Sequence, residues 1–468
     1  DHGSAVALGL RALDNLRPII EKGKTPPTVR ALQGELFQST GFAQLRADEL
    51  LAAQPSLRRA LEIYRDLGSL ELKSLSAASN HARTTWLLAE AIRDTGGSIT
   101  EARALLEEGI DVADRLLAVR PGHRPALRAK ASSLRTLAGL EFKLLQARKE
   151  IAYAAEGTTV DAIALNLDAG LGISRNNLRL GWTVSSVRSA WLGRLDDALR
   201  YSERGIEIGK DEYVDAFSAA NLVSFNGSAA WLAIESGNPD RGQNLLARAE
   251  SYVRLTESRG ASRVVIDFNL ARLDFYRGLI AVASGERAKL QSSRRSADEL
   301  WSRWRTGQFK DSDYGDYSTV ALVQLQGAQA ARLLGEPVAA ERHARQALEA
   351  AKKLAQPFSY PNRWRETQVR TELAIALAQQ GKKSEAVDVI QPALAFFRDP
   401  VERASDWQIL KSDQAHTLYA AALASDDAAR RRTYLIEAAQ RFDSMPESLR
   451  RFKSFAARRA DIARALAN

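Results

Sequence analysis

The sequence predicts an all-α solenoid of about seven or eight antiparallel helix pairs, and three observations lead to this fold class. Glycines recur in steps of 44 to 50 residues, at positions 97, 193, 237, 285, 335 and 381, where the gap from 97 to 193 equals about two steps. The residue twelve positions after each glycine is Gly or Ala, and those five after and seven before are small in five cases of six. Because only small side chains fit where two helix axes nearly touch, this ladder indicates paired helices. The low content of Pro, 13 in 468 residues, also favours helices.

The spacing divides the chain into three parts. Residues 1–75 are expected to form an irregular helical cap, because Pro55 would fall inside the second helix of a unit placed there. Residues 76–440 are the expected repeat array, with a degenerate unit turning near Leu145 and a further unit turning near Asp427. Residues 441–468 are expected to form a capping helix at the end of the array.

One stretch of the array resembles a known repeat family. The run from Trp191 to Gly205 resembles the turn and second helix of a tetratricopeptide repeat (TPR), and Trp182 lies where that motif carries its Trp. The resemblance implies a right-handed TPR-like superhelix over residues 76–440. A step near 47 residues, against the usual 34, implies longer helices. The chain therefore resembles the long-repeat TPR regions of bacterial multidomain signalling proteins, attached to Ser/Thr kinases or transcriptional regulators, and further domains are expected before Asp1.

The sequence offers little catalytic chemistry. It contains no Cys, so thiol nucleophiles and thiolate metal sites are absent. The five histidines lie far apart, and neither a phosphate-binding loop nor a nucleophile elbow is present. Residues many units apart in a solenoid are not expected to meet. We therefore expect no metal, no cofactor and no enzymatic activity.

Charge and hydropathy indicate which partners and which cellular location to expect. The net charge is +9, but the 57 acidic residues are interspersed with the 66 basic ones, which is typical of solvated helix faces. An acidic protein partner or a membrane surface is a weaker interpretation, and nucleic acid is the least favoured because no basic motif interleaved with aromatics is visible. No apolar stretch reaches the ~18 to 20 residues of a membrane span. A cytoplasmic protein is expected, or a periplasmic one if a membrane span precedes it.

The first helix of each pair is expected to line a concave groove that binds a partner. Its candidate residues are Trp231, Arg272, Phe275, Gln329 and Arg332. A clamp for a peptide carboxylate would need several cationic or amide side chains there, and only the two arginines qualify. A peptide or partner helix with an apolar or amphipathic face is therefore favoured. The open alternative is that these side chains are buried between units.

A second candidate surface comes from aromatic residues expected in two connectors between pairs. Its members are Trp301, Trp304, Tyr314, Tyr317, Phe358, Tyr360 and Trp364, with Phe309 and Trp407 alongside. Connectors of the same type project from the same edge of a solenoid, so we expect these rings to form one patch. The patch is either a contact surface for a partner or a seal between helix pairs.

These features predict a protein-interaction scaffold or regulatory sensor module of a larger bacterial signalling protein. Two alternatives stay open. The basic C-terminal helices and the aromatic edge could join two copies as a homo-oligomer, or the basic surface could bind RNA as a helical repeat.

Overall fold

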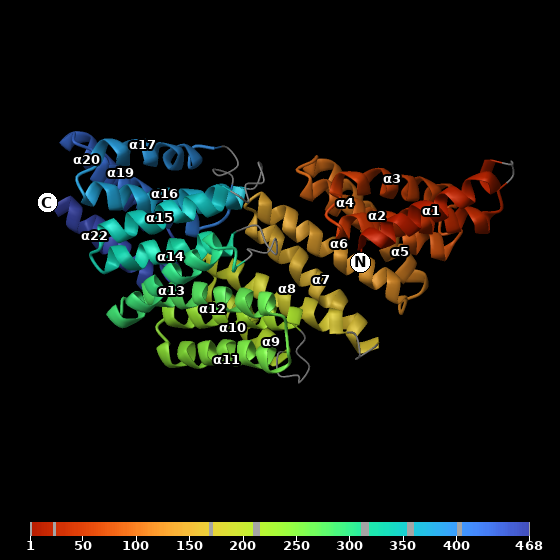
Figure 1. Ribbon diagram of the computed structural model, residues 1–468, viewed down its shortest axis with the longest axis horizontal. Helices are drawn as coiled ribbons and strands as arrows, with labels where there is room; N and C mark the ends of the chain where they lie inside the picture. Colours follow the sequence, from red (N-terminus) through yellow and green to blue (C-terminus); the bar gives the residue numbers. More distant parts are fainter. Residues whose placement is uncertain are drawn as a thin grey trace. The chain divides into compact units, whose positions relative to one another are not determined.

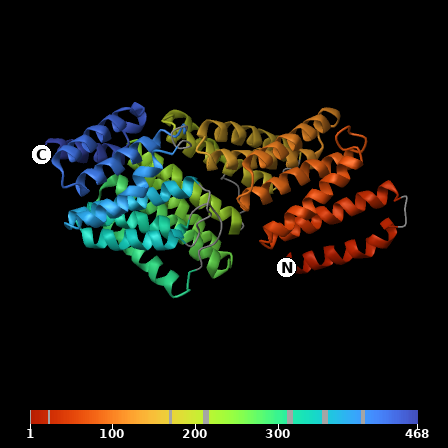
Figure 2. The same cartoon turned by 90° about the horizontal axis from the view of Figure 1, so that it is seen from above.

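A computed structural model describes residues 2–21, 25–167, 172–208, 216–309, 318–352, 360–399 and 405–467. All regular secondary structure in these ranges is helical, and consecutive helices lie side by side (Figures 1 and 2). Three helices come first: α1 (His2–Glu21), α2 (Pro27–Arg46) and α3 (Leu50–Asp66). Two follow at the end: α21 (Glu447–Arg450) and α22 (Lys453–Ala467).

Between them, the described residues form eight consecutive pairs, which confirms the predicted all-α repeat. The pairs are α4 (Leu75–Asp94) with α5 (Ile99–Val119), α6 (Arg124–Lys143) with α7 (Ala147–Leu167), α8 (Gly172–Trp191) with α9 (Leu195–Ile208), α10 (Ala216–Glu235) with α11 (Pro239–Ser258), α12 (Arg263–Ser284) with α13 (Arg287–Arg305), α14 (Thr319–Leu333) with α15 (Pro337–Lys352), α16 (Tyr360–Gln379) with α17 (Lys383–Phe396), and α19 (Ile409–Ala424) with α20 (Ala428–Asp443). The long step is filled by long helices, since α4 to α7 have 20 or 21 residues each.

The recurring glycines act at the turns of the pairs. Five of them, from Gly193 to Gly381, end the first helix in the left-handed conformation with φ between 67° and 89°, and Gly96 takes this role beside Gly97. This conformation is strained for residues with a Cβ atom, which explains the glycine better than close helix approach does. Leu145 occupies the predicted degenerate turn and has a φ of 58°, so that turn is confirmed.

The other small residues of the ladder do lie at close helix contacts. A Cβ atom added to Gly109 would stand 2.1 Å from the Thr85 hydroxyl oxygen, and one added to Gly205 would stand 2.3 Å from the Phe225 ring. The equivalent alanines in later pairs, such as Ala297 and Ala347, are fully buried. The small side chains therefore set the distance between neighbouring helices, within a pair at Gly109 and between consecutive pairs at Gly205.

The chain divides into two compact units. The first comprises Asp1–Glu141 with Lys149–Gly181, and the second comprises Phe142–Arg148 with Trp182–Asn468. In the first unit, α1 to α3 are regular helices of 17 to 20 residues, and Pro55 lies within α3. The segment expected to be irregular is thus regularly helical, and its role as a cap stays a prediction.

The second unit closes on itself. The Asp406 carboxylate accepts hydrogen bonds from the backbone N–H groups of Ala147 at 2.6 Å and Arg148 at 2.9 Å, and the Ser405 hydroxyl donates to the Leu145 carbonyl at 2.9 Å. These partners are 258 to 260 positions apart in sequence. The expectation that distant repeats do not meet is therefore wrong for this unit, because successive pairs turn far enough to bring its ends together.

Candidate functional site

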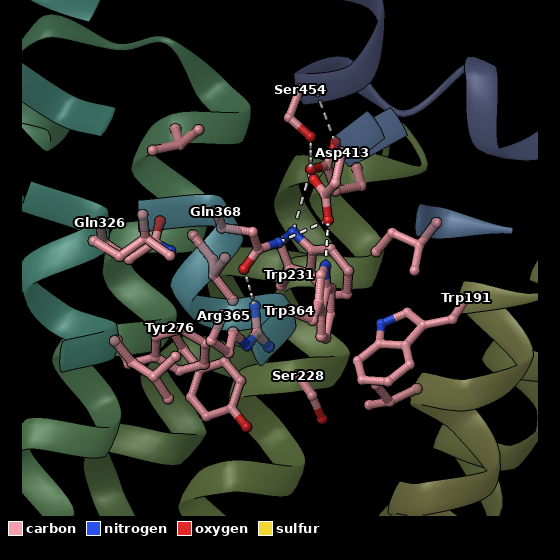
Figure 3. A pocket seen from close by; sticks show the side chains of 18 of the residues that line it. Trp191, Ser228, Trp231, Tyr276, Gln326, Trp364, Arg365, Gln368, Asp413 and Ser454 are labelled. Atoms are coloured by element: carbon pink, nitrogen blue, oxygen red, sulfur yellow. Dashed lines mark hydrogen bonds between the residues drawn. The ribbon is translucent and has the colours of Figure 1, made fainter. Parts of the chain in front are cut away.

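A cavity of about 350 Å³ lies within the second unit. Its walls come from the first helices of six successive pairs, α8, α10, α12, α14, α16 and α19, from α22, and from Phe142 at the end of α6. Side chains from these helices point toward one another in Figure 3. A repeated helix face, rather than a single loop, therefore builds the site.

Four of the five residues predicted for the groove lie on this wall. Trp231, Arg272 and Phe275 are half-buried there, and Gln329 is buried. Arg332 is not among the described lining side chains, because its guanidinium donates to the Glu372 carboxylate at 2.7 Å, where both side chains are buried. This buried ion pair favours a packing role for Arg332.

An aromatic cluster, made of Phe142, Trp191, Trp364 and Trp407, forms one end of the cavity region. The Trp191 ring centroid lies 4.5 Å from that of Trp407 and 5.3 Å from that of Trp364. Phe142 lies 5.5 Å from Trp407. The four rings come from segments far apart in sequence, and the closure of the unit brings them together.

Four of the residues expected to form one aromatic edge lie within helices. Trp301 and Trp304 lie within the last turns of α13, 4.9 Å apart between ring centroids, and pack against the buried Phe309. Tyr360 and Trp364 lie in the first turns of α16, and Trp364 belongs to the inner aromatic cluster. The connector placement is therefore wrong for these four residues. Three further members lie outside the described residues: Tyr314, Tyr317 and Phe358.

Two carboxylates of the cavity wall are held by protein donors. Asp413 accepts from the Trp364 indole at 2.7 Å, from the Gln368 amide at 2.8 Å and from the Arg458 guanidinium at 2.9 Å (Figure 3). The other carboxylate, Glu235, accepts from the Trp231 indole at 3.2 Å. Burial raises the pKa of Glu235, and its hydrogen bonds partly offset this effect.

Three arginines approach the same part of the cavity from α8, α12 and α16. Arg272 donates to the Ser224 hydroxyl at 2.9 Å, and Arg365 donates to the Gln368 amide oxygen at 2.8 Å. Stacking over aromatic rings orients these guanidinium groups, for example Arg365 at 4.2 Å from the Trp364 centroid.

The positive charges of these arginines converge on Tyr276. Burial raises the pKa of the Tyr276 phenol. The charges of Arg272, Arg365 and Arg188 act in the opposite direction. Arg188 and Arg365 belong to no motif in the sequence, and the one feature they share there is a position on the first helix of a pair.

One buried acceptor also faces the cavity. Gln326 of α14 is 3% exposed, lines the cavity, and has a side-chain oxygen without a hydrogen-bond partner among the described atoms (Figure 3). An unpaired buried acceptor costs about 1–3 kcal/mol. A ligand N–H or O–H group would satisfy it.

The described residues hold no group of three His, Asp or Glu side chains arranged for a metal ion. Among the helices they form, none combines the length and apolarity needed to cross a bilayer. What the cavity offers is aromatic surface, cationic groups and hydrogen-bonding amides.

Comparisons with known proteins find similar chains among solved structures. No protein-family model matches it, and no curated protein does. Among solved structures, it is similar to a Rap protein complexed with Competence and Sporulation Factor, at 13% identity and a TM-score of 0.42, covering 93% of this chain and 99% of that one. It is also similar to the human IFIT1 dimer with PPP-AAAA, at 14% identity and a TM-score of 0.36, covering 94% and 95%.

Proposed function

We propose that the second unit is a protein-interaction module that takes an amphipathic segment of a partner protein into its cavity. The observation that carries this proposal is the convergence of six successive first helices on one cavity. Three of these helices, α10, α12 and α14, contribute side chains at equivalent positions before their turn glycines, which suits an extended or helical segment.

The composition of the wall supports a peptide ligand. The half-buried Trp231 and Phe275 offer apolar surface to an anchor side chain. The Gln326 oxygen is placed to accept from a peptide N–H group. The converging arginines suit an acidic group of the same segment. In a signalling protein, occupation of the cavity would alter the pitch of the unit and so act as a sensor.

The test is selection of binding peptides from a random 12-residue library against the full chain, followed by calorimetry. Trp231→Ala and Phe275→Ala should each weaken the selected peptides about tenfold or more, because anchors of this kind dominate binding. Trp301→Ala is the matched control, since it removes a half-buried indole of α13 that does not line the cavity. Equal losses in all three variants, or no selected peptide, would contradict the proposal.

RNA is a second candidate, favoured by one specific observation. The structure places Arg188 3.9 Å from the Trp191 ring centroid and Arg365 4.2 Å from that of Trp364, so cationic and aromatic groups alternate in space although not in sequence. Stacked rings with arginines are typical of single-stranded nucleic acid sites. Affinity for a short single-stranded RNA that falls steeply with salt and requires Arg365 would favour this function over peptide binding.

A further inference from the structure

We infer that α22 covers the binding site of a partner helix, and that the partner is an amphipathic helix carrying the same pattern of residues as α22. The inference rests on the proposed function, because it names the chemistry of the segment that the second unit would bind. Its basis is the way α22 crosses from the last helix pair to α10 and α12.

The first half of α22 is held to the cavity wall by polar bonds of Ser454 and Arg458. On α10, Glu235 accepts from the Ser454 backbone N–H at 3.1 Å and from its hydroxyl at 2.5 Å. On α19, Asp413 accepts from Arg458 at 2.9 Å. Both carboxylates are at least 95% buried. A segment that replaced α22 would need a hydroxyl or N–H group at the first and a cation at the second, because unpaired buried carboxylates are strongly unfavourable.

Aromatic residues flank Ser454 in sequence and make further contacts. The Phe452 ring stands perpendicular to the Trp231 ring, with 6.0 Å between centroids, and packs on Phe455 at 5.6 Å. Trp231 is the side chain that the sequence marks as an anchor for a partner helix. An internal segment therefore already uses the predicted partner-binding surface.

The contacts of α22 define a pattern. Phe452 lies directly before the first residue of α22, and Phe455 and Arg458 follow it in steps of three residues. Phe455 and Arg458 therefore lie on one face of the helix, and Ser454 lies between the two rings in sequence. Residues of the opposite face, such as Arg464, are exposed and bond within α22 itself. The expected partner is thus a helix with two aromatic residues, a small hydroxyl and a cation at this spacing.

An internal occupant competes with an external one. Because α22 is part of the same chain, it competes with a free segment at a high effective concentration. The apparent affinity for the free segment is therefore reduced to the fraction of molecules in which α22 has left its site. Weakening the bonds of α22 should therefore strengthen binding of a free segment of the same pattern.

The experiment uses the full chain and a fluorescent synthetic peptide of residues 446–467, followed by anisotropy. The variant S454A/R458Q should bind the peptide about 10- to 100-fold more tightly than the wild type does, because its own helix has lost a charge-assisted bond. R464Q is the matched control on the same helix and should bind like the wild type. A peptide carrying R458Q should lose the gain.

Three results would overturn the inference. The first is S454A/R458Q binding the peptide no better than R464Q. The second is faster hydrogen exchange throughout α10 to α19 in S454A/R458Q, which would make α22 an integral part of the fold. The third is a wild-type dimer with exchanged C-terminal helices, seen by light scattering, which would make a second copy the occupant. If library peptides still bind through Trp231 in these cases, the proposed function stands and only this inference fails.

Discussion

Replacing Arg332 tests whether this residue packs the unit or binds a partner. Its guanidinium donates to the Glu372 carboxylate at 2.7 Å, and the two side chains are 11% and 1% exposed. His416 lies 3.2 Å from the other carboxylate oxygen, so three successive first helices are connected. The charge of Arg332 helps hold the pKa of Glu372 far below its usual range against the opposing effect of burial. Arg332→Met would leave this carboxylate without its main counter-charge.

The size of the effect follows from burial. Breaking a buried pair by removing one partner costs about 3–5 kcal/mol, whereas an exposed pair contributes about 0–1 kcal/mol. Arg342→Met is the matched control, because Arg342 pairs with Asp298 at 2.7 Å while both side chains are about half exposed. With a urea dependence near 3 kcal/mol per molar, Arg332→Met should lower the unfolding midpoint by about 1 M or more. The control should change it by less than about 0.3 M.

Tryptophan fluorescence during urea unfolding is a suitable assay, since seven of the eight Trp residues belong to the second unit. The double variant Arg332→Met/Glu372→Leu should recover at least about 2 kcal/mol, because an apolar pair of similar volume avoids the uncompensated charge. Equal stability of Arg332→Met and Arg342→Met would refute the assignment of Arg332 to packing. A specific loss of peptide binding in folded Arg332→Met would restore it to the binding surface.

Three further predictions concern pH and packing. Burial lowers the pKa of His343 to about 4, so the unfolded chain binds this proton more tightly and the second unit should lose on the order of 3 kcal/mol as pH falls from 6.5 to 4. His343→Gln should remove that loss, and an unchanged pH profile would contradict it. The hydrogen bond from His81 lowers the pKa of Glu108 to about 2. Glu108→Gln should therefore destabilise the first unit by about 1 kcal/mol at pH 7, after solvent screening, with a difference that vanishes as pH falls from 4.5 to 2, as followed by hydrogen exchange of α5. A Cβ atom added by Gly227→Ala would stand 2.3 Å from the Tyr276 ring, so the ring must shift. This variant should stay folded, as judged by circular dichroism, and lose peptide affinity about tenfold. Unchanged affinity would place Tyr276 outside the binding surface.

The repeat could be predicted from sequence because its determinants are local. A turn glycine and the small residues around it recur wherever two helices meet, and the turn at Leu145 follows from spacing alone although it has no glycine. The same periodicity identifies Trp231, Arg272 and Phe275 on the inner face, since equivalent positions of successive first helices have the same orientation.

The rest of the site depends on how rotation accumulates along the array. Each pair turns relative to the previous one by an amount set by details of packing, and no single sequence feature encodes the sum. Arg188 and Trp191 meet Trp407 only because the ends of the second unit join. The placement of α22 across α10 has the same origin.

Closure of the second unit also determines how far the effect of a bound ligand extends. In an open solenoid a ligand between two pairs affects only those pairs, because each unit packs on its neighbours. In the second unit, the bonds of Asp406 connect the turn before α7 with the segment before α19, and those of Glu235 connect α10 with α22. A ligand that displaces α22 would break the second connection and leave the first intact. The unit would then open on the side of α22 while the bonds of Asp406 hold the other side. A local binding event would thus change the curvature along all the helices that line the cavity.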